Sequence, residues 1–258
     1  MSTPSAASNP NLGLKLMITG RRKPGTTLAE HRHHIRWVHG ELVLKMIATD
    51  PAAAPQRYAQ NAVFDGQFRA TEPGTDPFAL NRDFVTQIWF ADMPAMLRSL
   101  ETTFYKEHLK SDEDHFVDQK TVVPLPTRER EMSARGGTVA QGAGVVKLFF
   151  FVQRAPGADA AAFKRAWTQL PPDMAGWPVA GRIRRHVQND VLARPGTTTP
   201  ADGIDEFWLD DEASARTLLT QWQGWVRHSL VAPGLVAETG HFGLLAHEDL
   251  VHAGRRAG

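Results

Sequence analysis

The chain has 258 residues, of which 42% are apolar, enough for a substantial hydrophobic core. Its 29 lysines and arginines nearly balance its 28 acidic residues, and a formal charge of +1 gives no field that would recruit nucleic acid or an anionic membrane. The absence of cysteine excludes disulfides, thiolate catalysis and cysteine-based metal sites. Because no segment has the pattern of a signal peptide or the roughly 20 apolar residues of a membrane span, we expect a cytoplasmic protein.

The first half of the chain predicts elements in the order β-α-β-β-α-β. Residues 1–13 contain no apolar run, so we expect a disordered head. A strand-like run begins at Lys15 and ends at a Pro-Gly turn, after which Thr27 is placed to cap a long helix, TLAEHRHHIRWVHGELVLKM. Strands at 56–64 and 82–92, a second helix (MPAMLRSLETTFYKEHL) and a closing strand (KTVVPLPT) complete the series.

The same order returns in the second half. Lys147 opens a matching strand 132 residues after Lys15 (147 − 15), and a helix follows with Asp159 as its cap. Further on, Trp208 follows Trp89 by 119 residues (208 − 89) within matching strands. A repeat of about 120 residues is too long for a solenoid unit and has the size of a duplicated small domain.

The repeat predicts the domain organisation and the fold class. Residues 133–144 are rich in glycine, alanine, serine and glutamine and predict a linker between domains at 14–132 and 145–252. Each β-α-β-β-α-β unit is typical of the ferredoxin-like fold, so the expected class is α+β. The strands FVTQIWF, LFFFV and DEFWL are apolar on both faces, whereas a half-solvated sheet should alternate. We therefore expect the two halves to pack sheet to sheet in one chain around a barrel-like core.

Five short motifs carry a family resemblance. They are Arg22 to Gly25, His39 to Val43 and Asp83 to Asp92 in the first half, and Arg154 to Gly157 and Asp202 to Asp211 in the second. In this order they resemble the EthD domain of the dimeric α+β barrel superfamily, and the resemblance implies a tandem EthD-like protein that forms an intrachain dimeric α+β barrel. The superfamily includes polyketide cyclases, lactone isomerases, dehydratases, cofactor-free monooxygenases and haem enzymes, so it implies the fold more firmly than the reaction.

Four histidines lie within nine positions of the first expected helix: His31, His33, His34 and His39. A helical projection at about 100° per residue gives a buried face, and we assign to it Leu28, Ile35, Val38 and Leu42. His31 and His39 fall on this face, His34 at its edge and His33 on the solvated side. Eight residues of helix separate His31 from His39 by about 12 Å, which excludes a shared metal ion. No HExxH pattern is present, and we expect no metal.

His39 is the leading catalytic candidate. It lies on the inner face at the helix end, at the position where the resemblance implies a family histidine. An imidazole ordinarily ionises at about pH 6.5 and is therefore the natural proton-transfer group near neutral pH. The repeat places Pro171 opposite His39, so only the N-terminal half is expected to be active. For His31, which aligns with Phe163, packing in the core is the main alternative to a role in binding.

The candidate substrate-binding residues are Tyr58, Gln87, Trp89, His31 and Asp83. Tyr58 and Gln87 are expected to orient a substrate oxygen, and Trp89 to form an aromatic wall. Core packing is the structural alternative for Tyr58 and Trp89, and turn capping is the alternative for Asp83. The charged run 106–114, with its flanking histidines, has the composition of a solvated helix face.

These residues predict a small-molecule enzyme without an organic cofactor. We expect acid/base chemistry of the lyase, dehydratase, cyclase or isomerase type on a hydrophobic oxygenated substrate, aromatic or polyketide-like, in a pocket between the sheet and the helices of the N-terminal half. Two alternatives stay open: a haem-dependent or cofactor-free oxygenase of the same superfamily, and a non-catalytic binding or accessory protein. No nucleic-acid or membrane partner is expected, and a homodimer also stays open.

Overall fold

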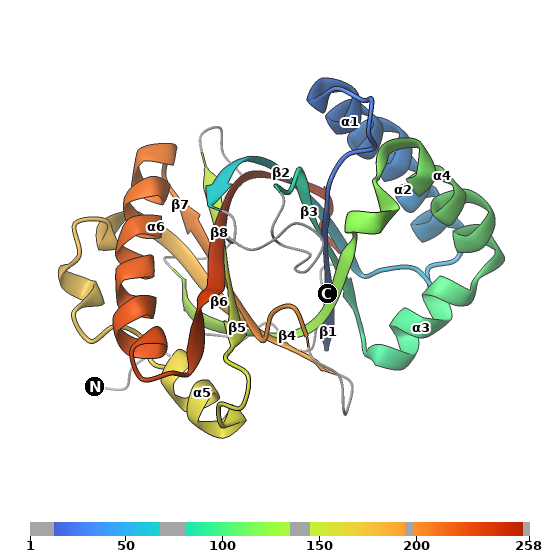
Figure 1. Ribbon diagram of the computed structural model, residues 1–258. Coiled ribbons are helices and arrows are strands. Elements are labelled where there is room, and N and C mark those ends of the chain that lie inside the picture. Colours follow the sequence, from blue (N-terminus) through green and yellow to red (C-terminus); the bar gives the residue numbers. More distant parts are fainter. Residues whose placement is uncertain (1–12, 68–80, 135–144, 194–198, 255–258) are drawn as a thin grey trace, which may run out of the picture.

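Eight strands close into one antiparallel barrel, with helices on its outside (Figure 1). The computed structural model describes residues 13–67, 81–134, 145–193 and 199–254. The strands of the first half are β1 (Leu14–Gly20), β2 (Arg57–Gln67), β3 (Phe84–Phe90) and β4 (Val123–Ala134). Those of the second half are β5 (Val146–Arg154), β6 (Ile183–Val191), β7 (Gly203–Leu209) and β8 (Val236–His252).

The expected α+β barrel is confirmed, but its two halves also join at their edges, which the prediction did not include. Around the barrel the strands follow the order β1-β3-β2-β8-β5-β7-β6-β4. The halves therefore meet edge to edge, through backbone pairing of β2 with β8 and of β4 with β6. The inner faces of the two halves pack against each other in the barrel core, and closure in addition pairs the free edge strands of each half, which removes exposed edges.

The helices cover the outside of the barrel in two groups (Figure 1). The first half carries α1 (Leu28–His33), η1 (His34–His39), α2 (Gly40–Thr49), α3 (Met93–Glu101), η2 (Tyr105–Leu109) and α4 (Lys110–Phe116). The second half carries α5 (Ala160–Trp167), α6 (Glu212–Val226) and η6 (Arg227–Val231). The expected caps are present: Thr27 forms a capping box with Glu30, and Asp159 accepts from the Ala162 amide.

The first long helix contains a π-helical segment, η1, in place of a regular α-helix throughout. The extra residue in a π turn rotates the following side chains relative to an ideal α-helical projection. Val38, which the projection placed on the buried face, is 40% exposed, whereas Ile35 and Val43 are buried. The assignment of Val38 to the buried face is therefore wrong.

Both faces of the sheet are buried, as the strand composition predicts. On the outer face, Leu16 and Phe90 pack with Met96 of α3, while on the inner face Met17 and Val85 pack with residues of the second half. Residues 1–12 of the expected head and 135–144 of the expected linker lie outside the described residues, and Ser133 and Ala134 belong to β4. Among the helices of the described residues, none has the length and hydropathy needed to cross a membrane.

Candidate functional site

A cavity of about 300 Å³ lies between the outer face of the sheet and the helices of the N-terminal half. This size falls at the lower end of small-molecule sites. Most of its wall is apolar, with side chains from β1, β3 and α2 that include Leu16, Ile18, Phe84, Ile88, Phe90, Val43 and Met46. The polar groups on the wall include His39, Tyr58, Tyr105 and Glu113.

His39 is held at the cavity by a carboxylate. Its Nδ1 lies 3.0 Å from Oδ2 of Asp112, and its ring packs against Phe116 with centroids 5.0 Å apart. The other carboxylate oxygen of Asp112 lies 2.9 Å from Nε2 of His34. Because a carboxylate accepts hydrogen bonds, Nδ1 of His39 carries the proton in the neutral ring, which leaves the lone pair on Nε2.

Asp112 remains ionised in this arrangement. Burial acts to raise the pKa of Asp112, but the hydrogen bonds from His39 and His34 outweigh it and hold that pKa below its ordinary value. The anion therefore fixes the tautomer of His39 and stabilises its protonated form. This is the relation that lets a histidine act as a general base.

Tyr58 presents a neutral phenol to the same cavity. Its side chain is 1% exposed, and its hydroxyl accepts a hydrogen bond from Nε2 of Gln60 at 2.9 Å. Burial raises the pKa of Tyr58 far above its ordinary value, so the hydroxyl keeps its proton. Within the described residues the hydroxyl has no acceptor for this proton, and it can therefore donate to a ligand oxygen.

Gln87 and Trp89 lie inside the barrel, away from His39. Consecutive residues of a strand point to opposite faces, so Ile88 lines the cavity while its two neighbours face the interior. Gln87 donates from Nε2 to Glu206 at 2.8 Å, and Trp89 donates from Nε1 to Glu129 at 3.3 Å. The structure thus brings Tyr58 to His39 and places Gln87 and Trp89 in a separate polar network.

That network links the two halves at the barrel centre. Nζ of Lys15 lies 2.5 Å from Glu206 and 2.7 Å from Glu129. Nζ of Lys147 lies 2.8 Å from Glu206 and 2.7 Å from Glu248. Burial acts to raise the pKa of Glu206, but the two lysines outweigh it and keep that pKa well below its ordinary value.

The network predicts that the protein loses stability in acid. Burial acts to raise the pKa values of Glu129, Glu206 and Glu248, but the lysines outweigh it. All three pKa values therefore lie below the ordinary 4.5. Their stabilising effect is therefore complete at pH values above the pKa of the glutamates in the unfolded chain. It declines as the pH falls from there through their lower pKa values in the folded protein, by up to about 1.4 kcal/mol per pH unit for each group. Urea unfolding midpoints should be nearly constant from pH 8 to 6 and should fall steeply below about pH 4.5. An unchanged midpoint down to pH 3 would contradict this prediction.

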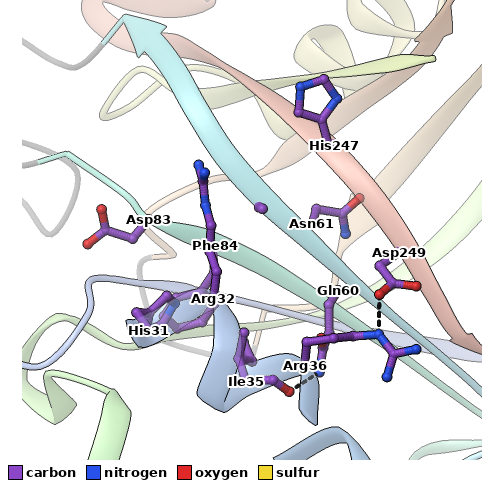
Figure 2. A pocket seen from close by; sticks show the side chains of 11 residues that line it. His31, Arg32, Ile35, Arg36, Gln60, Asn61, Asp83, Phe84, His247 and Asp249 are labelled. Carbon is purple, nitrogen blue, oxygen red and sulfur yellow. Dashed lines mark hydrogen bonds and ion pairs between the residues drawn. The ribbon is translucent and has the colours of Figure 1, made fainter. Parts of the chain in front are cut away.

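His31 and Asp83 lie beside a second, smaller pocket of about 180 Å³ (Figure 2). His31 is 1% exposed, and its ring stacks on Phe84 with centroids 5.4 Å apart. Asp83 accepts from the backbone N–H and from Nη1 of Arg22, both at 2.8 Å. The two pockets share Ile35 and Phe84 in their walls, so they adjoin without being one space.

Asp112, Glu113 and Tyr105 were not among the candidates, and the expectation of a solvated face is wrong for the two acids. The side chain of Asp112 is 12% exposed and that of Glu113 is 23% exposed. The signal for their placement was the spacing of Leu109 and Phe116, which are both buried and stand seven residues apart. Residues between them on the same helix face point inward with them.

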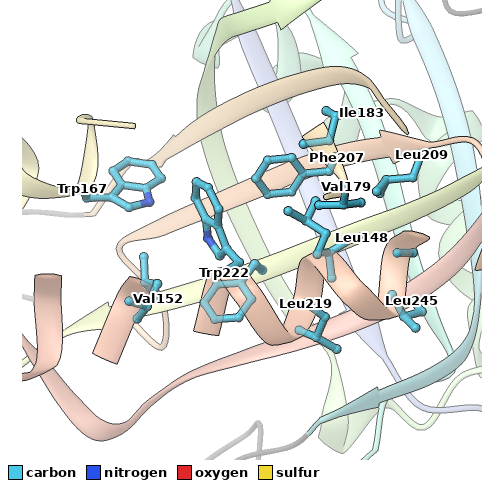
Figure 3. Packing of buried hydrophobic residues seen from close by; sticks show 14 of the residues in the cluster. Leu148, Val152, Trp167, Val179, Ile183, Phe207, Leu209, Leu219, Trp222 and Leu245 are labelled. Carbon is cyan, nitrogen blue, oxygen red and sulfur yellow. The ribbon is translucent and has the colours of Figure 1, made fainter. Parts of the chain in front are cut away.

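In the second half the corresponding outer face is packed with apolar side chains, among them the aromatic Trp167, Phe207 and Trp222 (Figure 3). His186 pairs with Phe207 as Tyr58 pairs with Ile88, so His186 stands where the first half has Tyr58. It stacks on Phe207 with centroids 4.0 Å apart, and Trp222 packs edge-on against both rings. In the described residues, this face of the second half is therefore packed core around His186.

No group of three or more histidine or acidic side chains in the described parts of the chain is arranged to hold a metal ion. His34 and His39 each hydrogen-bond to the carboxylate of Asp112 through one ring nitrogen, so the three side chains form a hydrogen-bonded cluster. The arrangement therefore fits proton transfer.

Comparison with known proteins finds a family match in the first half and a shared fold over nearly the whole chain. Residues 23–120 match the EthD domain family. An anthrone oxidase-like protein superposes with a TM-score of 0.61 at 13% identity, over 96% of this chain and 98% of the other. A provisionally assigned monooxygenase from Lactobacillus acidophilus superposes with a TM-score of 0.53 at 10% identity, over 94% and 97%. At such identities the likeness shows the shared fold alone.

Proposed function

We propose, from the premise that residues 23–120 form an EthD domain, that this protein is an enzyme that removes a proton from a hydrophobic aromatic small molecule bound beside His39. The observation that carries the proposal is the His39 and Asp112 pair on the wall of an apolar cavity of about 300 Å³. An imidazole whose Nδ1 is held by a carboxylate and whose Nε2 is unbonded within the described residues has the arrangement of a general base.

The step follows from the positions of three side chains. Nε2 of His39 takes a proton from a carbon that is conjugated with a carbonyl group, directly or through an aromatic ring, and the C–H electron pair moves through the conjugated system onto the carbonyl oxygen to give an enolate. Asp112 stabilises the imidazolium that forms. Tyr58, a neutral phenol on the same wall, donates a hydrogen bond to the enolate oxygen.

Two reaction classes share this first step. If the proton returns to another atom, or a leaving group departs, the enzyme is an isomerase, cyclase or lyase. If the enolate reacts with dioxygen, the enzyme is an oxygenase, and anthrone would give anthraquinone and one molecule of water per molecule of dioxygen. The oxygenase class is supported by the fold that the chain shares with an anthrone oxidase-like protein and with a provisionally assigned monooxygenase.

Anthrone separates these classes, because its methylene group is acidified by a ring carbonyl. Under nitrogen in deuterium oxide, the enzyme should speed the exchange of the methylene protons, measured by proton NMR. In air, an oxygenase should also take up dioxygen and form anthraquinone, measured with an oxygen electrode and by absorbance. Exchange without oxidation would favour the isomerase or lyase class. Neither exchange nor oxidation, with anthrone and its hydroxylated analogues, would favour the accessory-protein alternative and contradict the proposal.

The haem alternative does not fit the cavity. A space of about 300 Å³ suits a molecule of two or three fused rings and is too small for a four-pyrrole macrocycle with its side chains. The ring of His39, the candidate axial ligand, also packs against Phe116. Addition of haemin should therefore give no shifted Soret band that depends on His39.

The tandem origin of the chain is part of the proposal. Two ferredoxin-like repeats, 14–132 and 145–252, are supported by the strand order, in which each half contributes four adjacent strands in the same relative sequence. The paired lysines Lys15 and Lys147, each bound to a glutamate of its own half and to Glu206, add to this support. The second repeat is the structural one, while the cytoplasmic location and the homodimer stay predictions.

A further inference from the structure

The smaller pocket, which we call the polar chamber, has three buried polar atoms without hydrogen-bond partners on its side of the sheet. It is lined by His31, Arg32, Ile35, Arg36, Gln60, Asn61, Ala62, Asp83, Phe84, His247 and Asp249 (Figure 2). Within the described residues, these atoms are Nε2 of His31, Nε of Arg32 and Nη1 of Arg36. An unpartnered buried polar group costs free energy, so three beside one pocket indicate a ligand that pairs with them.

His31 offers the chamber a lone pair. Its Nδ1 lies 3.0 Å from the carbonyl oxygen of Phe116, and a carbonyl can only accept, so Nδ1 carries the proton. Burial lowers the pKa of His31, and the Phe116 carbonyl only partly opposes this, so the ring is neutral at pH 7. Nε2 of His31 is therefore an acceptor that requires a donor from a ligand.

Arg32 and Arg36 supply positive charge and donors. Arg32 donates from Nη2 to the carbonyl of Val63 at 3.0 Å, and within the described residues it has no carboxylate partner. Arg36 is paired through Nε with Asp249, which leaves its Nη1 unbonded. Asp83, the other acid of the chamber, is neutralised by Arg22. The chamber therefore carries one uncompensated cation and attracts an anion.

The second half shows the same place filled. Gln188 donates to the backbone carbonyl of Trp167 at 2.9 Å, just as Gln60 donates to that of Ile35 at 2.5 Å, so Trp167 and Ile35 are counterparts. The indole of Trp167 lies over Gly203, where an added Cβ would stand 2.6 Å from it. In the first half the smaller Ile35 stands with Phe84, the counterpart of Gly203, and the chamber lies beside both side chains.

At the matching place in the second half, the counterparts of the chamber's polar groups are paired. Lys164, the counterpart of Arg32 in the repeat, lies 2.9 Å from Asp190. Oε1 of Gln188, the counterpart of Gln60, accepts from Arg130 at 2.6 Å. Unpaired donors and an unpaired acceptor therefore stand together at the chamber and not at its counterpart.

We propose that the polar chamber binds a small carboxylate that carries a neighbouring hydroxyl group. The carboxylate accepts from Arg32 and Arg36, because guanidinium donors match its two oxygens. The hydroxyl donates to Nε2 of His31. A ligand of this class satisfies donors and acceptors together, which a plain carboxylate does not. The site is separate from the His39 cavity, so its failure would leave the proposed function untouched.

Lactate and propionate test the proposal, because they differ only by the hydroxyl group. Isothermal titration should show lactate binding about tenfold more tightly, since its hydroxyl pairs with a buried acceptor. His31→Phe should remove most of this difference, and Arg32→Met should weaken both ligands. His31→Phe is expected to fold because Phe163 stands at the matching place in the second half. Lys164→Met, the counterpart of Arg32→Met, should change neither affinity.

Equal binding of the two acids, or a preference for lactate that survives His31→Phe, would overturn the proposal. If His31→Phe does not fold, nitrogen-15 NMR of histidine in the unaltered protein gives the same answer. Lactate should move the Nε2 resonance of one neutral histidine in the direction of a hydrogen-bonded acceptor, and propionate should not. Absence of any lactate-dependent shift would also overturn it.

Discussion

Replacing His39 with alanine should lower the rate of anthrone proton exchange by about 10²–10⁴-fold, the usual contribution of a positioned general base. The variant should stay folded, because the side chain of His39 is only part of a wall whose apolar residues remain. The rate is measured by proton NMR in deuterium oxide, and the melting temperature is measured alongside it. His33→Ala is the matched control, since His33 lies on the same helix and is exposed. Full activity of His39→Ala would remove the assignment.

A companion change separates the base from its orienting partner. Asp112→Asn should also slow exchange, because an amide can donate as well as accept and no longer fixes the proton on Nδ1 of His39. His34→Ala removes the other ring bound to Asp112 but leaves its bond to His39, so its rate should stay close to that of the unaltered protein. Equal losses in His34→Ala and Asp112→Asn would indicate that the whole cluster has a structural role.

Much of the fold could be read from the sequence because local patterns specify it. The strand that contains Lys15 and the one that contains Lys147 each lead through a Pro-Gly turn into a helix, and both are present as expected. Apolar runs without alternation correctly predicted strands covered on both sides. His39 lies on the cavity wall, on the side that the projection gave it, even though the π-helical segment His34–His39 shifts side chains such as Val38 from their projected positions.

The rest depended on contacts between distant residues. Periodicity shows that Gln87 and Ile88 face opposite sides of a strand, but when both sides are buried it does not tell which side meets the cavity. The bond from Asp112 to His39 joins residues 73 positions apart and depends on how α4 packs against η1. The joining of the two halves at their edges is likewise a property of barrel closure, which strand composition does not specify.

Glu206→Gln should lower the free energy of unfolding by about 3 kcal/mol, at the low end of the range for breaking a buried ion pair. The side chain of Glu206 is 0% exposed and accepts from both Lys15 and Lys147, so its neutralisation breaks two buried ion pairs. Each lysine keeps one carboxylate partner, Glu129 or Glu248, which limits the effect. Urea unfolding followed by tryptophan fluorescence measures the change.

A surface pair gives the scale for comparison. Lys106 lies 2.5 Å from Glu101, but the two side chains are 55% and 75% exposed. Lys106→Ala should therefore cost at most about 1 kcal/mol, as is usual for a solvated ion pair. If Glu206→Gln costs no more than Lys106→Ala, the buried network has no special role in stability.

The pseudo-twofold relation makes a stricter prediction about the same network. Gln87 stands in the first half where Glu206 stands in the second, and Nζ of Lys147 already lies 2.5 Å from Oε1 of Gln87. Asn61 bonds Gln87 as Asn189 bonds Glu206, so the surroundings of the two positions correspond. Adding Gln87→Glu to Glu206→Gln moves the carboxylate across the axis with no change in net charge, and most of the lost stability should return. Further destabilisation of the double variant would show that the two positions are not equivalent. The symmetry expected from the proposed internal duplication would then not extend to the stability of this network.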